Sequence, residues 1–276
     1  MEKKIWFITG ISSGLGQVLA NYARGNGAFV IGTFRNPEQV RAYNQEHGDQ
    51  SLAVLLDITD GAQVESVVAA ILARFGRIDV LVNNAGYGLS GAVEETSMEE
   101  ARDIFEANFF GPLRLAQAFL PMFRKQGRGH ILQVSSHGGV KAFPGFGLYN
   151  ASKFALEGFS EALAAEVAPL GIRLTIVEPG PFRTNFAGDG FQQAAKVIPD
   201  YHATAGAFRE RIKAVDGKQE GDPEKAAAAM YQITEMPEPP LRLPLGKVAL
   251  ASINSKLEQV RLDVERMREV AEGAVY

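Results

Sequence analysis

The chain has 276 residues, of which 46% are hydrophobic and 22% are charged, and it carries a net charge of −4 and no cysteine. This composition fits a single α/β domain over residues 1–276, and it excludes disulfides, thiolate metal sites and thiol nucleophiles. The lack of a basic block argues against a nucleic-acid partner, and no stretch approaches the ~18 consecutive apolar residues of a membrane span. Because the N-terminus shows no signal-peptide pattern, we expect a cytoplasmic protein.

The first predicted strand leads into a glycine-rich turn. Residues 5–9 form an apolar run without alternation, as in a strand buried on both faces of a parallel sheet. A G-x-x-x-G-x-G turn from Gly10 to Gly16 follows, and then a helical pattern to about Arg24. Such a turn presents free N–H groups and the positive end of a helix dipole to a phosphate. The spacing differs from the G-x-G-x-x-G fingerprint, so tight packing at a strand–helix corner is the alternative interpretation.

The end of the second predicted strand, residues 28–33, bears on the choice of cofactor. A carboxylate at this place in a dinucleotide fold holds a ribose 2′-hydroxyl, whereas an arginine accommodates a 2′-phosphate. No Asp or Glu occurs between Ala28 and Pro37, and Arg35 is present. This pattern favours NADP(H) over NAD(H), although NAD(H) is not excluded and a solvated surface arginine is the alternative.

Strands and helices alternate through the rest of the chain. Further strands are predicted at 52–56, 78–82, 129–135 and 171–177, with helices at 61–75, 97–123 and 149–167. Gly111-Pro112 interrupts the second of these helical stretches and predicts a kink or break near Asn108. The alternation favours a doubly wound parallel sheet, a Rossmann fold, of about seven strands with helices on both faces. Ligands bind such sheets outside the carboxyl ends of the strands.

Tyr149 and Lys153 are spaced to lie on one face of a helix, one turn apart. An ammonium at ~4 Å, at an effective dielectric of ~20, would favour the phenolate by roughly 4 kcal/mol and lower the tyrosine pKa by up to about 3 units. The pair therefore predicts an acid/base that works near neutral pH. Ser136 stands at the end of the preceding strand, thirteen residues before Tyr149.

Taken together, these motifs resemble the short-chain dehydrogenase/reductase family over residues 4–245. Within it, the chain looks most similar to bacterial oxidoreductases related to 17β-hydroxysteroid dehydrogenases and carbonyl reductases. The matching pieces are Thr9-Gly10-x-x-x-Gly14-x-Gly16, Asp57, Asn83-Asn84-Ala85-Gly86, Asn108, Ser136, Tyr149-x-x-x-Lys153 and Pro179-Gly180 with Thr184.

The resemblance implies hydride transfer between NADP(H) and a carbonyl or alcohol. By this resemblance Tyr149 is the general acid or base. Lys153 lowers the tyrosine pKa and holds the nicotinamide ribose, and Ser136 binds the substrate oxygen. Asn108 would anchor a water that links Lys153 to solvent. Asn83 is expected to tie strands together rather than touch cofactor. The implied cofactor contacts are Gly10, Ile11, Ser12, Ser13, Gly14, Leu15, Gly16, Asp57, Ile58, Asn84, Ala85, Gly86, Tyr149, Lys153, Pro179, Gly180, Phe182 and Thr184, to which Arg35 is added.

Two positions depart from the family pattern. Phe182 stands where valine or isoleucine is common, so the contact near the nicotinamide differs in detail. Ser13 replaces a basic residue that many NADP-preferring members carry, which leaves Arg35 as the main support for NADP(H).

Residues 181–221 lack regular periodicity and are predicted to form a substrate lid. The segment is rich in aromatic side chains, which argues against a disordered linker, and about half of these rings are expected to pack beneath the lid. Phe186, with His137, Phe143 and Phe146 of the loop before Tyr149, is expected to line an apolar substrate pocket. The histidines show no metal-ligand spacing, so no metal site is predicted.

The C-terminal region begins with a predicted edge strand at 241–245 and continues as an amphipathic helical tail over 246–276. Its apolar side chains repeat at intervals of four and three, namely Ile253, Leu257, Val260, Val264 and Met267. This stripe is too short for a long coiled coil, and it docks either on the protein's own sheet or on a partner subunit. A homodimer or homotetramer is expected, since oligomers are the norm in the family.

Two other classes of function remain open at this stage. One is a dinucleotide-binding sensor that has the pocket without turnover, although a sensor needs neither Tyr149 nor Lys153. The other, more distant, is a sugar-nucleotide epimerase or dehydratase, which uses the same pair but spaces its glycines differently and carries a larger C-terminal domain.

Overall fold

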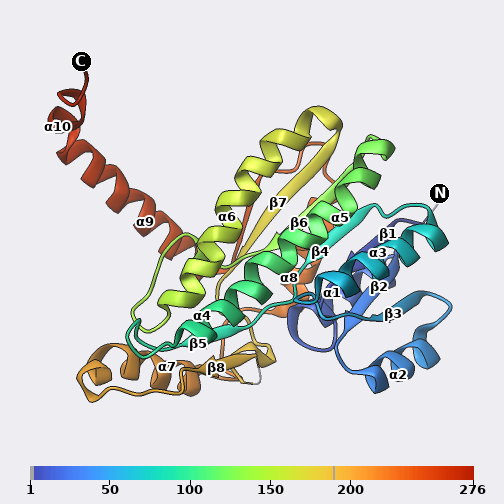
Figure 1. Cartoon of the computed structure of the whole chain (residues 1–276), viewed down its shortest axis with the longest axis horizontal. Helices are drawn as coiled ribbons and strands as arrows, with labels where there is room; N and C mark the ends of the chain where they lie inside the picture. Colours follow the sequence, from blue (N-terminus) through green and yellow to red (C-terminus); the bar gives the residue numbers. More distant parts are fainter. Residues whose placement is uncertain (1–2, 189) are drawn as a thin grey trace.

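A computed structural model describes residues 3–188 and 190–276, and it is built around one seven-stranded sheet (Figure 1). The strand order is β3-β2-β1-β4-β6-β7-β9, and every neighbouring pair is parallel. The predicted doubly wound fold is confirmed. The strands are β1 Ile5–Ile8, β2 Phe29–Phe34, β3 Ser51–Leu55, β4 Val80–Asn83, β6 Gly129–Val134, β7 Ile172–Pro179 and β9 Arg242–Leu245.

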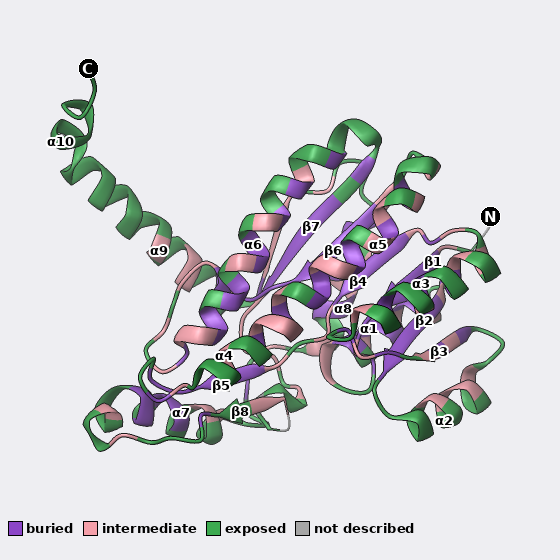
Figure 2. Ribbon diagram, viewed as in Figure 1, coloured by how far each residue is buried: buried purple, intermediate pink, exposed green. Residues whose placement is uncertain are grey.

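Helices cover both faces of this sheet, and each face has its own core. The helices α3 (Gly61–Phe75), α5 (Gly111–Gln126) and α6 (Gly147–Val167) pack on one face, while α1 (Gly14–Gly25) and α8 (Pro223–Ile233) pack on the other (Figures 1 and 2). Successive residues of β1 feed the two cores in turn, because strand side chains alternate between faces. Phe7 lies 5.0 Å from Phe119, ring centre to ring centre, and Trp6 stacks on Tyr231 at 5.5 Å.

The predicted kink near Asn108 is a π-helical turn, Glu106–Phe110, between α4 (Met98–Phe105) and α5. The wider turn carries one residue more than an α-helical turn, and such turns often occur at functional sites. Asn108 is fully buried inside it. The interrupted helical stretch expected over 97–123 is therefore two helices joined by this turn.

Two features were not predicted from the sequence. The helix α2 (Pro37–His47) begins with Asn36 accepting a hydrogen bond from the Glu38 N–H, and it packs on the core through half-buried Val40 and Tyr43, too short an apolar pattern to stand out in the sequence. The second feature is a two-stranded parallel sheet of β5 (Gly88–Ser90) and β8 (Phe191–Gln193). The segment 181–221 thus holds more regular structure than expected, because it also contains the helix α7 (Ala207–Val215).

The C-terminal tail leaves the body as α9 (Lys247–Arg266) and a short helix α10 (Arg268–Glu272), after β9 at the edge of the sheet. Both helices project away from the domain (Figure 1), and almost all of their surface is exposed (Figure 2). Among the residues that the structure describes, the first turns of α9 are the part of the tail that contacts the body: Ser252 bonds His137 at 2.8 Å, and Ser255 accepts from Lys141 at 3.2 Å. The apolar stripe of the tail does not dock on the protein's own sheet.

Candidate active site

The turn between β1 and α1 has a backbone shape that requires glycine. Gly10 and Gly14 have positive φ angles of 69° and 63°. A Cβ on Gly16 would lie 2.3 Å from Asn84 Nδ2 and 2.4 Å from Gly10 O. The side chain of Ser13, at the N-cap, makes no capping hydrogen bond. The first-turn N–H groups thus keep the arrangement that binds phosphates.

The neighbouring end of β4 is fixed to this turn by Thr9 and Asn84. Thr9 Oγ1 accepts hydrogen bonds from the backbone N–H groups of Asn84 and Ala85, both at 2.9 Å. Asn84 Nδ2 donates to the carbonyl oxygens of Thr9 and Gly10 at 2.9 and 3.1 Å. The Asn84 side chain, one of the expected cofactor contacts, therefore holds two strand ends together.

Several other expected cofactor residues place their side chains in the core. Ile11 is buried against Gly32, and Ile58 is buried against Gly111, so that a Cβ on either glycine would collide with an isoleucine. Leu15 packs against the same core as Ile11. These residues can therefore contact a ligand through their backbone groups and not through their side chains.

Polar side chains at the strand ends differ in whether they already form hydrogen bonds within the protein. Arg35, just after β2, is exposed. Asp57 accepts hydrogen bonds from the N–H and hydroxyl of Thr59 at 2.9 and 2.7 Å. Asn83 donates to Gln133 Oε1 at 2.9 Å, which ties β4 to β6 as predicted.

Asn108 and Lys153 meet beside Gly86. Asn108 Nδ2 donates to Tyr87 O at 2.9 Å and to Ser152 Oγ at 3.1 Å, and Asn108 Oδ1 accepts from Tyr87 N at 3.1 Å. A Cβ on Gly86 would lie 2.6 Å from Asn108 Oδ1 and 3.7 Å from Lys153 Nζ. The glycine therefore keeps open the space into which both side chains reach.

Burial moves the pKa values of Tyr149 and Lys153 in a direction that the sequence did not predict. Burial raises the pKa of Tyr149 to about 12, against a smaller lowering by its hydrogen bond with Ser136. Burial lowers the pKa of Lys153 to about 8. Lys153 Nζ donates to Val134 O at 2.9 Å and lies 5.9 Å from the centre of the tyrosine ring. In this structure burial is thus the largest influence on Tyr149, and its pKa lies above the ordinary value, not below it as the spacing with Lys153 predicts.

Ser136 is held close to Tyr149 by a small network. Ser136 Oγ accepts from Gly138 N at 2.9 Å, and a Cβ on Gly138 would lie 3.2 Å from Ser136 Oγ and 3.4 Å from Tyr149 Cε1. Asn150 Nδ2 donates to Gly138 O at 2.8 Å, and Asn150 Oδ1 accepts from Phe143 N at 2.9 Å. Asn150 thus shapes the loop between the serine and the tyrosine. The sequence reasoning missed it, and its place directly after Tyr149 at a helix start was the signal.

The family model described as short chain dehydrogenase matches residues 4–195. The chain belongs to the short-chain dehydrogenase family. It is 41% identical over 269 residues to Oxidoreductase BOA17 of Botryotinia fuckeliana, covering 97% of this chain and 98% of that protein. It is 37% identical over 248 residues to 3-ketodihydrosphingosine reductase of Bacteroides thetaiotaomicron, covering 89% of each.

Solved structures also place the chain among the short-chain dehydrogenases. A crystal structure of a short-chain dehydrogenase from Streptomyces avermitilis has 43% identity and a TM-score of 0.93, with all of both chains covered. ElxO, solved with NADP bound, has 27% identity and a TM-score of 0.75 over 91% of this chain and 100% of its own. A family member from Burkholderia phymatum, in complex with NAD, has 23% identity and a TM-score of 0.82 over 95% of each chain, and so shows the shared fold alone.

In this short-chain dehydrogenase an aromatic wall stands beside Tyr149. The ring of Phe146 stacks on that of Tyr149, with 4.0 Å between centres and 17° between planes. Phe191 and Phe208 pack on the other rings of the same cluster, 5.4 and 5.0 Å from Phe146. Phe186 is 40% exposed and lies 6.1 Å from Tyr149. Of the lid's aromatic side chains, Phe186 thus lies beside Tyr149 with a partly exposed ring, while Phe191 and Phe208 pack beneath the lid.

Two expected contact residues lie elsewhere. His137 faces the tail helix, since its Nδ1 lies 2.8 Å from Ser252 Oγ and its ring 5.1 Å from that of Phe143. Burial lowers the pKa of His137 to about 4, so it is neutral at pH 7. Phe182 packs against Gly221 and the core beneath β9.

The remaining part of the expected cofactor segment reaches the glycine-rich turn. A Cβ on Gly14 would lie 3.8 Å from Thr184 Cβ. Gly180 N donates to Leu245 O at 2.9 Å, which fixes the backbone directly after Pro179 at the end of β7. The turn after β1 and the segment after β7, far apart in sequence, therefore line one edge of the sheet.

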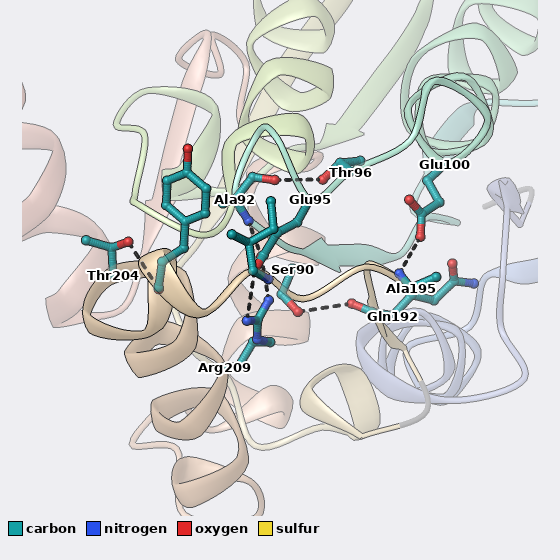
Figure 3. A network of polar contacts seen from close by, with 11 residues as sticks. Ser90, Ala92, Glu95, Thr96, Glu100, Gln192, Ala195, Thr204 and Arg209 are labelled. Carbon is teal, nitrogen blue, oxygen red and sulfur yellow. Dashed lines mark hydrogen bonds and ion pairs between the residues drawn. The ribbon is translucent and has the colours of Figure 1, made fainter.

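The lid is tied to the body through Glu95 (Figure 3). Arg209 of α7 donates to both oxygens of this buried carboxylate at 2.7 and 3.3 Å, and Ala92 N and Ile198 N also donate to it at 2.8 Å. Ala195 N donates to Glu100 Oε1 at 2.9 Å. The lid half that follows β8 is therefore anchored, and not simply a mobile flap.

A buried charge cluster close to Lys153 was also missed. Glu157, one helical turn after Lys153, is buried and pairs with Arg242 at 2.7 Å, and Arg242 also pairs with Glu178 and Glu161. Burial raises the pKa of Glu157 to about 7. No sequence motif marked the cluster, because its members come from α6, β7 and β9.

Across residues 3–188 and 190–276, no group of three or more His, Asp or Glu side chains is arranged to hold a metal ion. Among the helices of the same residues, none is long and apolar enough to span a membrane.

Proposed function

We propose that this chain transfers a hydride between NADP(H) and an apolar carbonyl or alcohol substrate, with Tyr149 as the general acid or base. The observation that carries the proposal is the convergence of four side chains around two glycines. Asn108 and Lys153 adjoin Gly86, while Ser136 and Tyr149 adjoin Gly138. Membership of the short-chain dehydrogenase family supports oxidoreductase chemistry for such a group.

The residues present fit a nicotinamide dinucleotide. The glycine-rich turn offers its N–H groups to a pyrophosphate, and Thr184 adjoins the same turn. When bound, such a cofactor supplies the hydride for reduction or accepts it in oxidation. Structural neighbours bind NAD or NADP. We favour NADP(H) because exposed Arg35, with no carboxylate between Ala28 and Pro37, suits a 2′-phosphate.

The protonation states of the site suit reduction. Carbonyl reduction needs a proton on the substrate oxygen, and Tyr149, with a pKa of about 12, holds its phenolic proton at neutral pH. Lys153, with a pKa of about 8, is mostly charged at neutral pH and suits holding the nicotinamide ribose and passing a proton on to Tyr149. The Ser136 hydroxyl donates to the substrate oxygen, and the Asn108 turn holds the route by which a proton returns to Lys153.

An apolar ketone is the substrate class that the surroundings of Tyr149 favour. Phe146 and Phe186 present rings next to the phenol, and residues 181–221 act as the lid over them. Phe143, which packs against the same aromatic cluster, would form the outer wall of this pocket. The relative named as a 3-ketodihydrosphingosine reductase supports a ketone as the reacting group.

We further propose a cytoplasmic homo-oligomer, a dimer or tetramer, whose subunit is the single domain 1–276. The expected partner is a small molecule, and neither the composition nor the net charge favours nucleic acid.

The test is turnover by the purified protein. NADPH should be oxidised with apolar ketones, including 3-ketodihydrosphingosine, and Tyr149→Phe should reduce kcat by about 10²–10⁴-fold, far more than it changes the Kd for NADPH. Tight NADP binding without turnover on a broad panel of carbonyls would point instead to a sensor. Equal kcat for wild type and Tyr149→Phe would overturn the assigned acid.

A further inference from the structure

The projecting part of α9 carries an apolar stripe that the subunit leaves uncovered. Leu257, Val260, Val264 and Met267 are 58%, 42%, 63% and 49% exposed. Leu250 and Ile253 extend the same stripe toward the body, and the intervals alternate between three and four residues. That spacing is typical of the seam along which two helices pair.

The stripe cannot fold back on its own subunit without breaking contacts that set the direction of α9. His137 bonds Ser252, and Lys141 bonds Ser255, both on the first turns of the helix. The helix has 20 residues, which corresponds to a length of about 30 Å, most of it beyond these contacts. Helices without tertiary contacts are marginal in water, so this one gains stability from a partner.

The charges along the stripe identify the partner. Four charged side chains flank the seam, namely Lys256, Arg261, Asp263 and Arg268. The two arginines form ion pairs within the helix, Arg261 with Glu258 and Arg268 with Glu265. The other two, Lys256 and Asp263, form no ion pair with any residue in 3–188 or 190–276. They carry opposite charges and lie seven residues apart, two helical turns along the same edge of the seam.

We infer that α9 pairs antiparallel with α9 of a second copy of this chain. In the register that places Leu257 on Val260 of the second copy, Ile253 meets Val264 and Leu250 meets Met267. Lys256 then lies beside Asp263 of the second copy, and the two-fold axis repeats this pair. A parallel arrangement would instead oppose Lys256 to Arg261. The inference does not rest on the proposed function.

A membrane surface fits the stripe less well. Interfacial helices are rich in Lys and Arg on the polar face and carry Trp or Phe on the other. The tail has neither Trp nor Phe, and its basic and acidic side chains balance. The basic residues are Lys247, Lys256, Arg261, Arg266 and Arg268, and the acidic ones are Glu258, Asp263, Glu265, Glu269 and Glu272.

Sedimentation equilibrium of the full chain tests the pairing. Leu257→Asp should lower the average mass by a factor of two, because it places a carboxylate in the seam. Leu262→Asp is the matched control, since Leu262 is 53% exposed on the opposite side of the same helix, and it should leave the mass unchanged. A monomeric wild type, or equal loss of mass in both variants, would overturn the inference.

Exchanging the charges tests the antiparallel register. Lys256→Asp and Asp263→Lys should each raise the dissociation constant roughly tenfold, and the double variant should restore it. A double variant no tighter than the singles would overturn the register. Vesicles of phosphatidylcholine and phosphatidylserine test the membrane alternative. If wild type sedimented with the vesicles and Leu257→Asp did not, while the two proteins had the same average mass in solution, a membrane would be the partner of the stripe and the inference would be overturned.

Discussion

Glu95 and Arg209 join, in one buried ion pair, the loop before α4 to the helix α7 of the lid. The distance from Arg209 Nη1 to Glu95 Oε2 is 2.7 Å, and the two side chains are 8% and 0% exposed. Backbone N–H groups of Ala92 and Ile198 satisfy the carboxylate further. Because the two residues are far apart in sequence, the pair fixes the position of α7 against the loop before α4 (Figure 3).

Replacing Glu95 by glutamine should destabilise the protein by about 3–5 kcal/mol, since Arg209 would stay buried without a counter-charge. The hydrogen bond from Arg209 lowers the pKa of Glu95 from 4.5 to about 2. A carboxyl with a lowered pKa in the folded state contributes stability above its unfolded pKa and loses it as pH falls. The free energy of unfolding of the wild type should therefore fall by about 3 kcal/mol between pH 4.5 and 2 because of this group. Urea unfolding at several pH values measures both effects.

Glu99→Gln is the control for this experiment, because Glu99 is an exposed glutamate close by in the chain. It should change the free energy of unfolding by less than about 0.5 kcal/mol. If Glu95→Gln unfolded at the same urea concentration as Glu99→Gln, the pair would not be what anchors the lid.

Gly138→Ala should impair activity more than stability. The new Cβ would lie 2.7 Å from Asn150 Nδ2, 3.2 Å from Ser136 Oγ and 3.4 Å from Tyr149 Cε1, so the loop that places the serine must shift. A misplacement of about 1 Å at reacting groups costs on the order of 10²-fold, and we expect such a fall in kcat/KM.

The matched control is Gly158→Ala in α6, where a Cβ meets nothing within 4 Å. That variant should keep its activity and gain about 0.5–1 kcal/mol of stability, since alanine favours a helix interior over glycine. Steady-state kinetics and thermal unfolding of both variants decide the matter. Equal kcat/KM in the two alanine variants would show that the loop tolerates the extra methyl group.

The sequence predicts the sheet well, because buried parallel strands are apolar throughout and each ends in polar or small residues. Residues 5–9 and the glycine turn are an example, and the helix predicted at 61–75 is observed with the same bounds. The proline at 112 also indicates the break that becomes the π-helical turn at Asn108. These features depend on neighbours in sequence, which is why local patterns indicate them.

What the sequence does not predict depends on contacts between distant segments. The β5–β8 sheet has three residues a strand, and Glu95 meets Arg209 only after the lid folds over. The pKa of Tyr149 is a further case, because helical spacing places Lys153 nearby but does not reveal how far burial desolvates the phenol. The tail shows the same limit, since a stripe at intervals of three and four does not tell which surface covers it.

The kcat/KM for ketone reduction should fall as pH rises through about 8. Burial lowers the pKa of Lys153 to about 8, and its charge is lost above that pH, while Tyr149 keeps its proton up to about 12. The pH dependence of kcat/KM reports the groups of the free enzyme, so the fall belongs to Lys153. In Lys153→Arg, the side chain stays charged to above pH 12, and the fall near pH 8 should disappear. A fall at the same pH in this variant would assign it to another group.

Arg35→Asp should reverse the choice between the two dinucleotides. Arg35 is exposed directly after β2, and no carboxylate lies between Ala28 and Pro37 to repel a 2′-phosphate. The variant loses a charge-assisted contact and gains a repelling carboxylate, so the Kd for NADPH should rise by roughly 10–100-fold. The new aspartate should lower the Kd for NADH, because it can accept a hydrogen bond from the ribose 2′-hydroxyl. Arg41→Asp, which makes the same charge change on α2, is the control and should shift neither Kd more than about twofold. Isothermal titration of the parent and both variants with each dinucleotide provides the six dissociation constants. Equal affinity of the parent protein for NADPH and NADH, or equal shifts in the two variants, would mean that Arg35 does not read the phosphate.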